Sequence, residues 1–148
     1  MNDETLAIIT VASLQADEKL EATGDMTRLT ASVRTFLLVY GAQGVIDNGG
    51  YKSFFGDNWP GNPPYQDFIS AYEAIGCRTQ ARELRRVVAT FPFPNPHLDK
   101  DRRRAFMESN YDKTALSVRG WGDALCGDEA VWEKLVRYYQ TNEDEFVG

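Results

Sequence analysis

The sequence contains few of the residues from which metal sites, disulfide frameworks and catalytic triads are built. Among its 148 residues are two cysteines, Cys77 and Cys126, and one histidine, His97. The cysteines are 49 positions apart and have no Cys-x-x-Cys spacing, so neither a zinc site nor a disulfide framework is indicated. We therefore expect no metal or other cofactor, and two reduced, mostly buried thiols.

The short motifs of the common enzyme classes are also missing. The sequence has no phosphate-binding loop, dinucleotide-binding glycine fingerprint, zinc-binding helix motif or nucleophile elbow. His97 lies in a proline-rich stretch without a neighbouring cysteine or second histidine, which favours a loop histidine over a catalytic base. Paired acids such as Asp99 and Asp101 are better explained as helix caps or solvated side chains. We predict no catalytic residues and no enzymatic activity.

Long apolar runs are absent as well. No run approaches the roughly 20 residues of a membrane-spanning helix, and the first four residues carry two acids where a secretory signal is positively charged. We expect a cytoplasmic location and no membrane partner. A chain with 43% hydrophobic and 26% charged residues is typical of a globular protein, and its length suits a single domain over residues 1–148.

Glycine and proline divide the chain into segments with helical spacing. One such segment is residues 28–46, where apolar residues recur from Leu29 to Tyr40 on one side of a helix. Residues 4–22 are predicted to be helical too, although the β-branched run from Ile8 to Val11 leaves a strand open there. A helical turn with Tyr51, Phe54 and Phe55 and a loop over 56–64 are predicted to follow. The next helix is capped by Asn62 within this loop and ends at Gly76. The remaining predicted elements are a helix from Thr79 to about Phe91, a short helix starting at Asp99, and a helix capped by Asp128. The predicted fold is all-α, a single compact domain of about five to seven helices with short Gly/Pro-rich loops.

The charges are segregated along the chain. Residues 1–25 hold six acids and one base, and residues 128–148 hold six acids and two bases. The net charge is −6, so the intervening residues are net basic. This pattern disfavours binding of nucleic acid by the whole surface and suits a basic protein partner, although acidic ends also aid solubility. If the acids bind a partner, the best placed are Asp17, Glu18, Glu21 and Asp25, since Asp17 and Glu21 are one helical turn apart with Glu18 beside them.

Two other sites deserve testing. Arg78, Arg82, Arg85 and Arg86 fall on one side of their predicted helix and form an arginine face that could contact phosphates. A solvated or salt-bridged face is the simpler interpretation, so we do not expect direct nucleic-acid binding. The residues Asn48, Gly49, Gly50 and Tyr51 are the second alternative, as a small-molecule cleft, although packing explains them better.

A family resemblance lies in two stretches of the sequence. Asp47-Asn48-Gly49-Gly50-Tyr51-Lys52-Ser53-Phe54-Phe55, followed by Ala71-Tyr72-Glu73-Ala74-Ile75-Gly76-Cys77, resembles the signature of the bacterial DNA-mimic protein family. The similarity continues through Phe91-Pro92 and Leu135-Val136-Arg137-Tyr138-Tyr139, and covers about residues 27–146. It implies an all-helical fold. For the founding member it also implies an acidic surface that imitates DNA phosphates and occupies the DNA-binding site of a transcription regulator.

Composition and resemblance together indicate a non-catalytic acidic protein that binds another protein. The expected partner is a basic DNA-binding regulator engaged by mimicry. The alternatives are nucleic-acid binding through the arginine face and a small-molecule sensor with its cleft near Asn48. The sequence leaves a homodimer open.

Overall fold

The computed structural model describes residues 1–111 and 124–148, and these described residues form helices without a strand. The all-α prediction is confirmed, and the strand alternative near residues 6–14 is wrong because these residues lie within the first helix. The helices are α1 (Asp3–Thr23), α2 (Ala31–Gly56), α3 (Tyr65–Ala74), α4 (Arg78–Val88), α5 (Lys100–Tyr111) and α6 (Glu129–Thr141), with 3-10 turns η1 (Met26–Arg28), η2 (Pro96–Leu98) and η4 (Glu143–Glu145).

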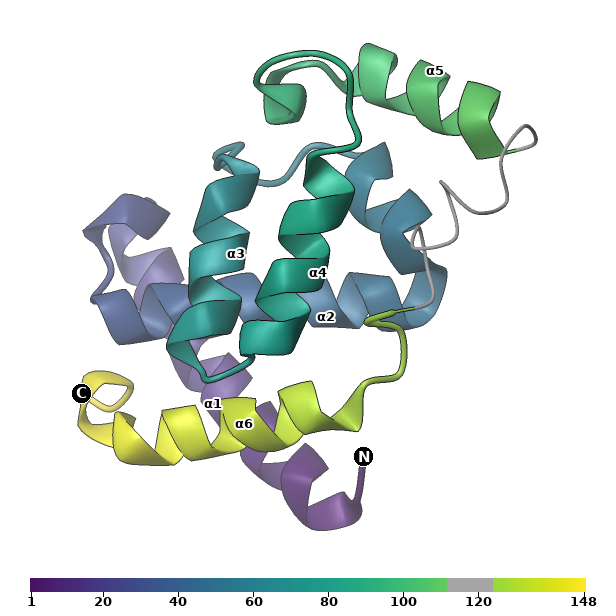
Figure 1. Cartoon of the computed structure of the whole chain (residues 1–148). Coiled ribbons are helices and arrows are strands. Elements are labelled where there is room, and N and C mark those ends of the chain that lie inside the picture. Colours follow the sequence, from purple (N-terminus) through teal and green to yellow (C-terminus); the bar gives the residue numbers. More distant parts are fainter. Residues whose placement is uncertain (112–123) are drawn as a thin grey trace.

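Helix α2 is the centre of the fold. Helices α3 and α4 stand side by side across one side of it, and α1 and α6 pack against its first half (Figure 1). From Val33 to Ile46 its inward side contributes apolar residues that are almost completely buried. A helix that is in contact with neighbours on several sides needs such a broad apolar surface. None of the described helices is long and apolar enough to cross a membrane.

A break at Gly50 divides α2 in two. Gly50 has φ 66° and ψ −168°, a backbone region that is essentially restricted to glycine. The structure therefore agrees with the prediction of a helix over residues 28–46 followed by a separate helical turn with Tyr51, Phe54 and Phe55, and this second segment runs to Gly56. Beyond the break Tyr51, Phe54 and Phe55 are fully buried, which confirms the prediction that they fill the core.

Aromatic rings from several elements meet around Phe54. Its ring centroid lies 4.8 Å from that of Phe55, 5.2 Å from Phe68 of α3 and 5.3 Å from Trp59 of the loop before α3. The Phe55 and Phe68 rings are edge-on to it, the arrangement that ring quadrupoles favour. The second half of α2 thus holds α3 and the loop over residues 56–64 in place.

A buried arginine joins α5 to this cluster. Arg103 is completely buried, and its guanidinium donates hydrogen bonds to the carbonyl oxygens of Phe55 at 2.8 Å and Pro96 at 2.8 Å. It also donates to the Asp57 carbonyl at 3.3 Å and to Asn58 Oδ1 at 3.0 Å. An uncompensated buried charge is costly, and these four acceptors provide the compensation. Arg103 therefore belongs to the framework and not to a basic surface.

Polar side chains attach the start of the C-terminal segment to α2. Asp47 accepts hydrogen bonds from Trp132 Nε1 at 2.9 Å and from the Gly127 backbone amide at 2.8 Å. Gln43 donates to the Leu125 carbonyl at 2.7 Å and accepts from the Tyr72 hydroxyl at 2.9 Å. The first residue of the predicted family signature, Asp47, is thus a structural anchor.

Several predicted boundaries shift. Asn2 caps α1 by accepting a hydrogen bond from the Thr5 amide, so this helix starts one residue before the predicted residue 4, and α4 starts at Arg78 rather than at Thr79. The reason for the second shift is Gly76, whose φ of 90° ends α3 and leaves Cys77 as the only residue between the turn and α4. Asp128 does cap α6 as predicted, accepting from the Ala130 amide at 3.1 Å.

The Gly50 break generates a stability prediction. Replacing Gly50 by Ala should destabilise the protein by about 1–3 kcal/mol, because a Cβ atom is strained in this backbone region. Gly44→Ala is the matched control, since Gly44 lies in the same helix and an added Cβ would meet nothing within 4 Å. It should leave stability unchanged or raise it by up to about 1 kcal/mol. Urea unfolding followed by circular dichroism would decide, and equal midpoints for the Gly50 variant and the wild type would contradict the account.

Candidate functional site

The predicted acidic patch lies at the C-terminal end of α1. We use this name for Asp17, Glu18, Glu21 and Asp25, and all four side chains are exposed. Among the described residues none of the four has an ion-pair partner. Three of them share one side of the last turns of α1, as the spacing predicted. Their charges are therefore available to solvent or to a partner.

Asp25 differs from the other three in its local bonding. It lies after the end of α1 and caps η1, where its Oδ1 accepts hydrogen bonds from the Thr27 hydroxyl at 2.7 Å and the Thr27 amide at 2.9 Å. These hydrogen bonds favour the carboxylate and lower the pKa of Asp25. These bonds favour the charged form of the side chain, whose geometry is set by the turn that leads into α2.

The fold brings the acidic C-terminal end against this part of α1. Lys19 Nζ donates to the Gly148 carbonyl at 3.0 Å, and the Tyr139 hydroxyl donates to Gln15 Oε1 at 2.6 Å. Phe146 is buried, with its ring 4.9 Å from that of Tyr139 and 5.4 Å from that of Phe36. The turn η4, which lies between Tyr139 and Phe146 in the sequence, exposes Glu143, Asp144 and Glu145. Two acidic segments that are over 100 residues apart in the sequence are therefore in direct contact.

Sequence reasoning treated these acidic ends as separate and did not predict their meeting. The signal that could have revealed it is Phe146, an aromatic residue immediately after three acids. The only base in the first 25 residues, Lys19, binds backbone carbonyls rather than the neighbouring carboxylates.

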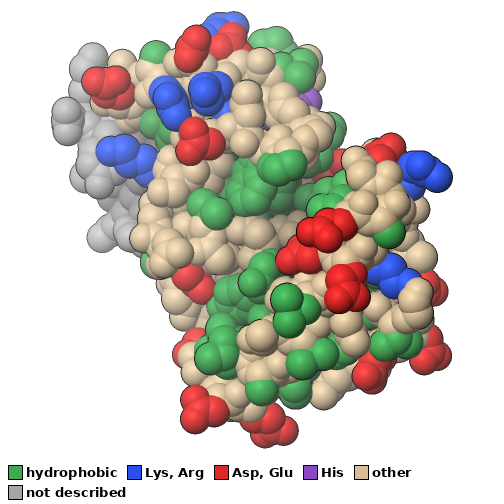
Figure 2. Space-filling model, turned by 180° about the vertical axis from the view of Figure 1, so that it is seen from behind, with side chains coloured by type: hydrophobic (Ala, Val, Ile, Leu, Met, Phe, Trp, Pro, Cys, Tyr) green, Lys and Arg blue, Asp and Glu red, His purple; other side chains and the backbone are tan. Residues whose placement is uncertain are grey.

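Figure 2 shows the side of the molecule that is turned away in Figure 1, where acidic side chains gather beside hydrophobic ones.

The arginine face of α4 forms as predicted, with all four arginines exposed. Two of them are paired: Arg85 Nη2 lies 2.5 Å from Glu73 Oε1, and Arg86 lies 2.5 Å from Glu83. The hydrogen bonds that Arg86 donates to the Glu83 carboxylate raise the pKa of Arg86. These partners come from α3 and α4, not from the acidic ends of the chain. Arg78 and Arg82 carry the remaining positive charge of this face.

The residues of the predicted alternative cleft have different environments. Asn48 and Gly49 are exposed, whereas Gly50 and Tyr51 are buried. The Tyr51 ring lies 5.9 Å from that of Phe55, and burial raises the pKa of its hydroxyl well above the ordinary value. That hydroxyl has no hydrogen-bond partner in the described part of the chain. The packing role assigned to Tyr51 agrees with this burial, and a ligand cleft here stays a prediction.

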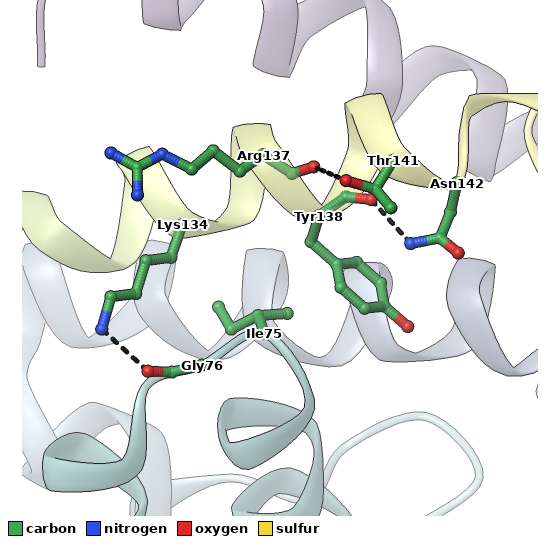
Figure 3. Close-up of a pocket in the computed structure, with 7 residues that line it drawn as sticks. All are labelled: Ile75, Gly76, Lys134, Arg137, Tyr138, Thr141 and Asn142. Carbon is green, nitrogen blue, oxygen red and sulfur yellow. Dashed lines mark hydrogen bonds between the residues drawn. The ribbon is translucent and has the colours of Figure 1, made fainter.

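A shallow cavity of about 430 Å³ lies between α6 and the turn from α3 to α4 (Figure 3). Lys134 reaches across it and donates to the Gly76 carbonyl at 2.7 Å. Thr141 and Asn142 bind backbone carbonyls of their own helix, those of Arg137 and Tyr138. None of the predicted site residues contributes to this cavity, which is lined by Ile75, Gly76, Lys134, Arg137, Tyr138, Thr141 and Asn142.

His97, the candidate base that the sequence analysis rejected, lies in η2 with its ring 6.3 Å from that of Tyr65. In residues 1–111 and 124–148 there is no group of three or more His, Cys, Asp or Glu side chains that could hold a metal ion. The edge-on contact with Tyr65 gives His97 a packing role beside Pro96, which accepts a hydrogen bond from Arg103.

One comparison with known proteins gives a match. Residues 27–145 match the family model described as DMP19-like protein. No curated protein and no solved structure matches the chain. The matched segment includes α2 to α6 and the acids of η4, whereas α1 and the acidic patch lie before it.

The two thiols should differ in reactivity. Cys77 is buried as expected, and burial raises its pKa to about 11. Cys126 is exposed, which corrects the expectation of two mostly buried thiols, because it lies in the turn that Asp47 anchors. With a chromogenic disulfide reagent at about pH 8, the folded protein should show one fast thiol, and the second only after unfolding. Cys126→Ser should remove the fast phase, and two thiols of equal reactivity in the folded protein would contradict this.

Proposed function

Because the chain belongs to the DMP19-like protein family, we propose that it is a non-catalytic binding protein whose exposed carboxylates engage a basic, DNA-binding protein. In this proposal the carboxylates occupy positions at which that partner otherwise binds DNA phosphates. The surface involved combines the acidic patch with the acids of η4. The function is therefore inhibition or regulation of a DNA-binding protein by mimicry.

The observation that carries the proposal is the meeting of the two acidic ends. The segments 1–25 and 128–148 have net charges of −5 and −4, whereas the rest of the chain is net basic. Lys19 and Gln15 contact the C-terminal segment, so the two acidic segments lie side by side. A strongly negative surface on one side attracts basic partners over several ångströms and speeds their association.

The density of carboxylates supports a comparison with DNA. Asp17, Glu18 and Glu21 place three charges within about 6 Å of helix axis, at a rise of 1.5 Å per residue. One strand of DNA carries a charge about every 3.4 Å, and the duplex one about every 1.7 Å. The patch therefore offers a basic groove a charge density between these two values, over a length of roughly one helical turn.

Removing these charges tests the proposal. In the acidic variant Asp17→Asn, Glu18→Gln and Glu21→Gln are combined, which retains side-chain shape and removes three charges. Capture from nuclease-treated lysate of the source cell should retain a basic, DNA-binding protein on the wild type and at least about tenfold less on the acidic variant. The difference should shrink between about 0.1 M and 1 M salt, because the Debye length falls from ~10 Å to ~3 Å. Duplex DNA should compete with the wild-type chain for the purified partner.

A charge-matched variant serves as the control. Asp67→Asn, Asp101→Asn and Glu108→Gln remove three exposed charges from α3 and α5, which lie outside the proposed surface. This variant should bind as the wild type does. An equal loss of captured partner in both variants would show that binding depends on net charge alone and not on the proposed surface. A partner that is lost on nuclease treatment would favour the arginine face as a nucleic-acid site.

A further inference from the structure

Helix α1 exposes large hydrophobic residues on the side that carries its acids. Among the described residues six large hydrophobic side chains are exposed, and five of them belong to the two ends of the chain. Three lie on α1: Leu6 is 51% exposed, Val11 51% and Leu14 60%. We call these three the apolar stripe. Single exposed apolar residues are ordinary, but a group on one helix indicates a binding surface.

The stripe and the acids form a single surface. At 3.6 residues per turn Leu6, Val11 and Leu14 fall within about 140° of arc, with Leu14 near the middle. The acids before and after the stripe lie within the same arc, apart from Glu4, which lies about 20° beyond its edge, and the surface extends over about 27 Å of helix axis. An apolar centre between charged ends is the usual anatomy of a protein–protein interface. The acids at the two ends are Asp3 and Glu4 at the N-terminal side, and Asp17, Glu18 and Glu21 at the C-terminal side.

The other side of α1 accounts for the packing of the helix. Ile9, Ala12 and Ala16 are buried there against the rest of the chain. The apolar stripe is thus not needed to attach α1 to the fold. Nor does the family match include it, since the matched segment begins at residue 27. The stripe is therefore free to serve a partner.

Charge decides which partner fits. Two copies facing each other through this surface would bring carboxylates against carboxylates in either relative orientation, and Lys19 is occupied by backbone carbonyls. Like charges in close contact oppose association. We infer that α1 docks an amphipathic helix of a partner, with apolar residues at its centre and lysine or arginine at both ends. This inference rests on the proposed function and adds that binding includes an apolar component that salt does not screen.

A synthetic helix can test the inference without the natural partner. The probe is a peptide of about 18 residues, long enough to span the surface, with leucines on one face and lysines elsewhere and at both ends. The control peptide has the same composition with leucines distributed around the helix. Binding to the full chain is measured by fluorescence anisotropy at about 0.1 M and 1 M salt. The wild type should bind the probe more tightly than the control peptide at both concentrations.

An apolar variant is compared with the acidic variant. It combines Leu6→Gln, Val11→Thr and Leu14→Gln and should lose about tenfold or more in affinity at both salt concentrations. The acidic variant should lose affinity mainly at low salt. Leu98→Gln is the matched control, because Leu98 is 65% exposed but lies in η2, and its affinity should not change.

The outcomes separate the two proposals. If only the acidic variant loses affinity, the proposed function stands and the apolar docking is overturned. If only the apolar variant does, the stripe docks a helix and the proposed role of the carboxylates fails. Equal binding of probe and control peptide overturns the amphipathic partner. A dimer in sedimentation that the apolar variant abolishes would instead make α1 an interface between copies of this chain.

Discussion

The backbone conformation at Gly50 is the constraint on which the positions of the other helices depend. It turns α2, so that the residues after the break do not continue along the first half of the helix but pack with Phe54 against Phe68 of α3. The Phe54 and Phe55 rings then contact rings from α3, from its preceding loop and from Phe91. The carbonyl groups freed at the end of α2 become acceptors for Arg103, so α5 is tied to the same point.

The first half of α2 holds α6 and the C-terminal segment in place. Phe36 of this half packs against Phe146 and Tyr139, and Asp47 binds Trp132 and the Gly127 amide. These contacts position α6 and the C-terminal segment beside α1. The contact between the two acidic segments is therefore a consequence of the core, since Phe146 is buried beside α1 and brings the C-terminal segment to Gln15 and Lys19. Removing charges from this surface should leave the fold intact, which makes the binding experiments interpretable.

Local patterns in the sequence predicted most of the helices, because helical spacing and caps are local properties. The helical spacing of apolar residues from Val33 to Tyr40 and the Asp128 cap are examples, although the predicted start at residue 28 falls before α2, which begins at Ala31. Long-range contacts were not predictable in this way. Arg103 looks like its exposed neighbours Arg102 and Arg104 in the sequence, and three of its four acceptors are more than 40 residues away along the chain. The meeting of the acidic ends depends on Phe146 finding Phe36, which no local pattern encodes. Spacing alone placed Asp17, Glu18 and Glu21 on one side of α1, and these three and Asp25 are exposed, whereas their role in binding stays a prediction.

The central claim is that the outer side of α1 and the adjacent acids of η4 form the binding surface. A map of backbone amide chemical shifts in the 16.7 kDa chain, recorded by NMR while the leucine–lysine peptide is added, tests it most directly. We expect the largest shifts between residues 3 and 25 and between residues 143 and 148, with little change on α4. Shifts concentrated at Arg78 to Arg86, or around the cavity near Lys134 and Arg137, would contradict the account.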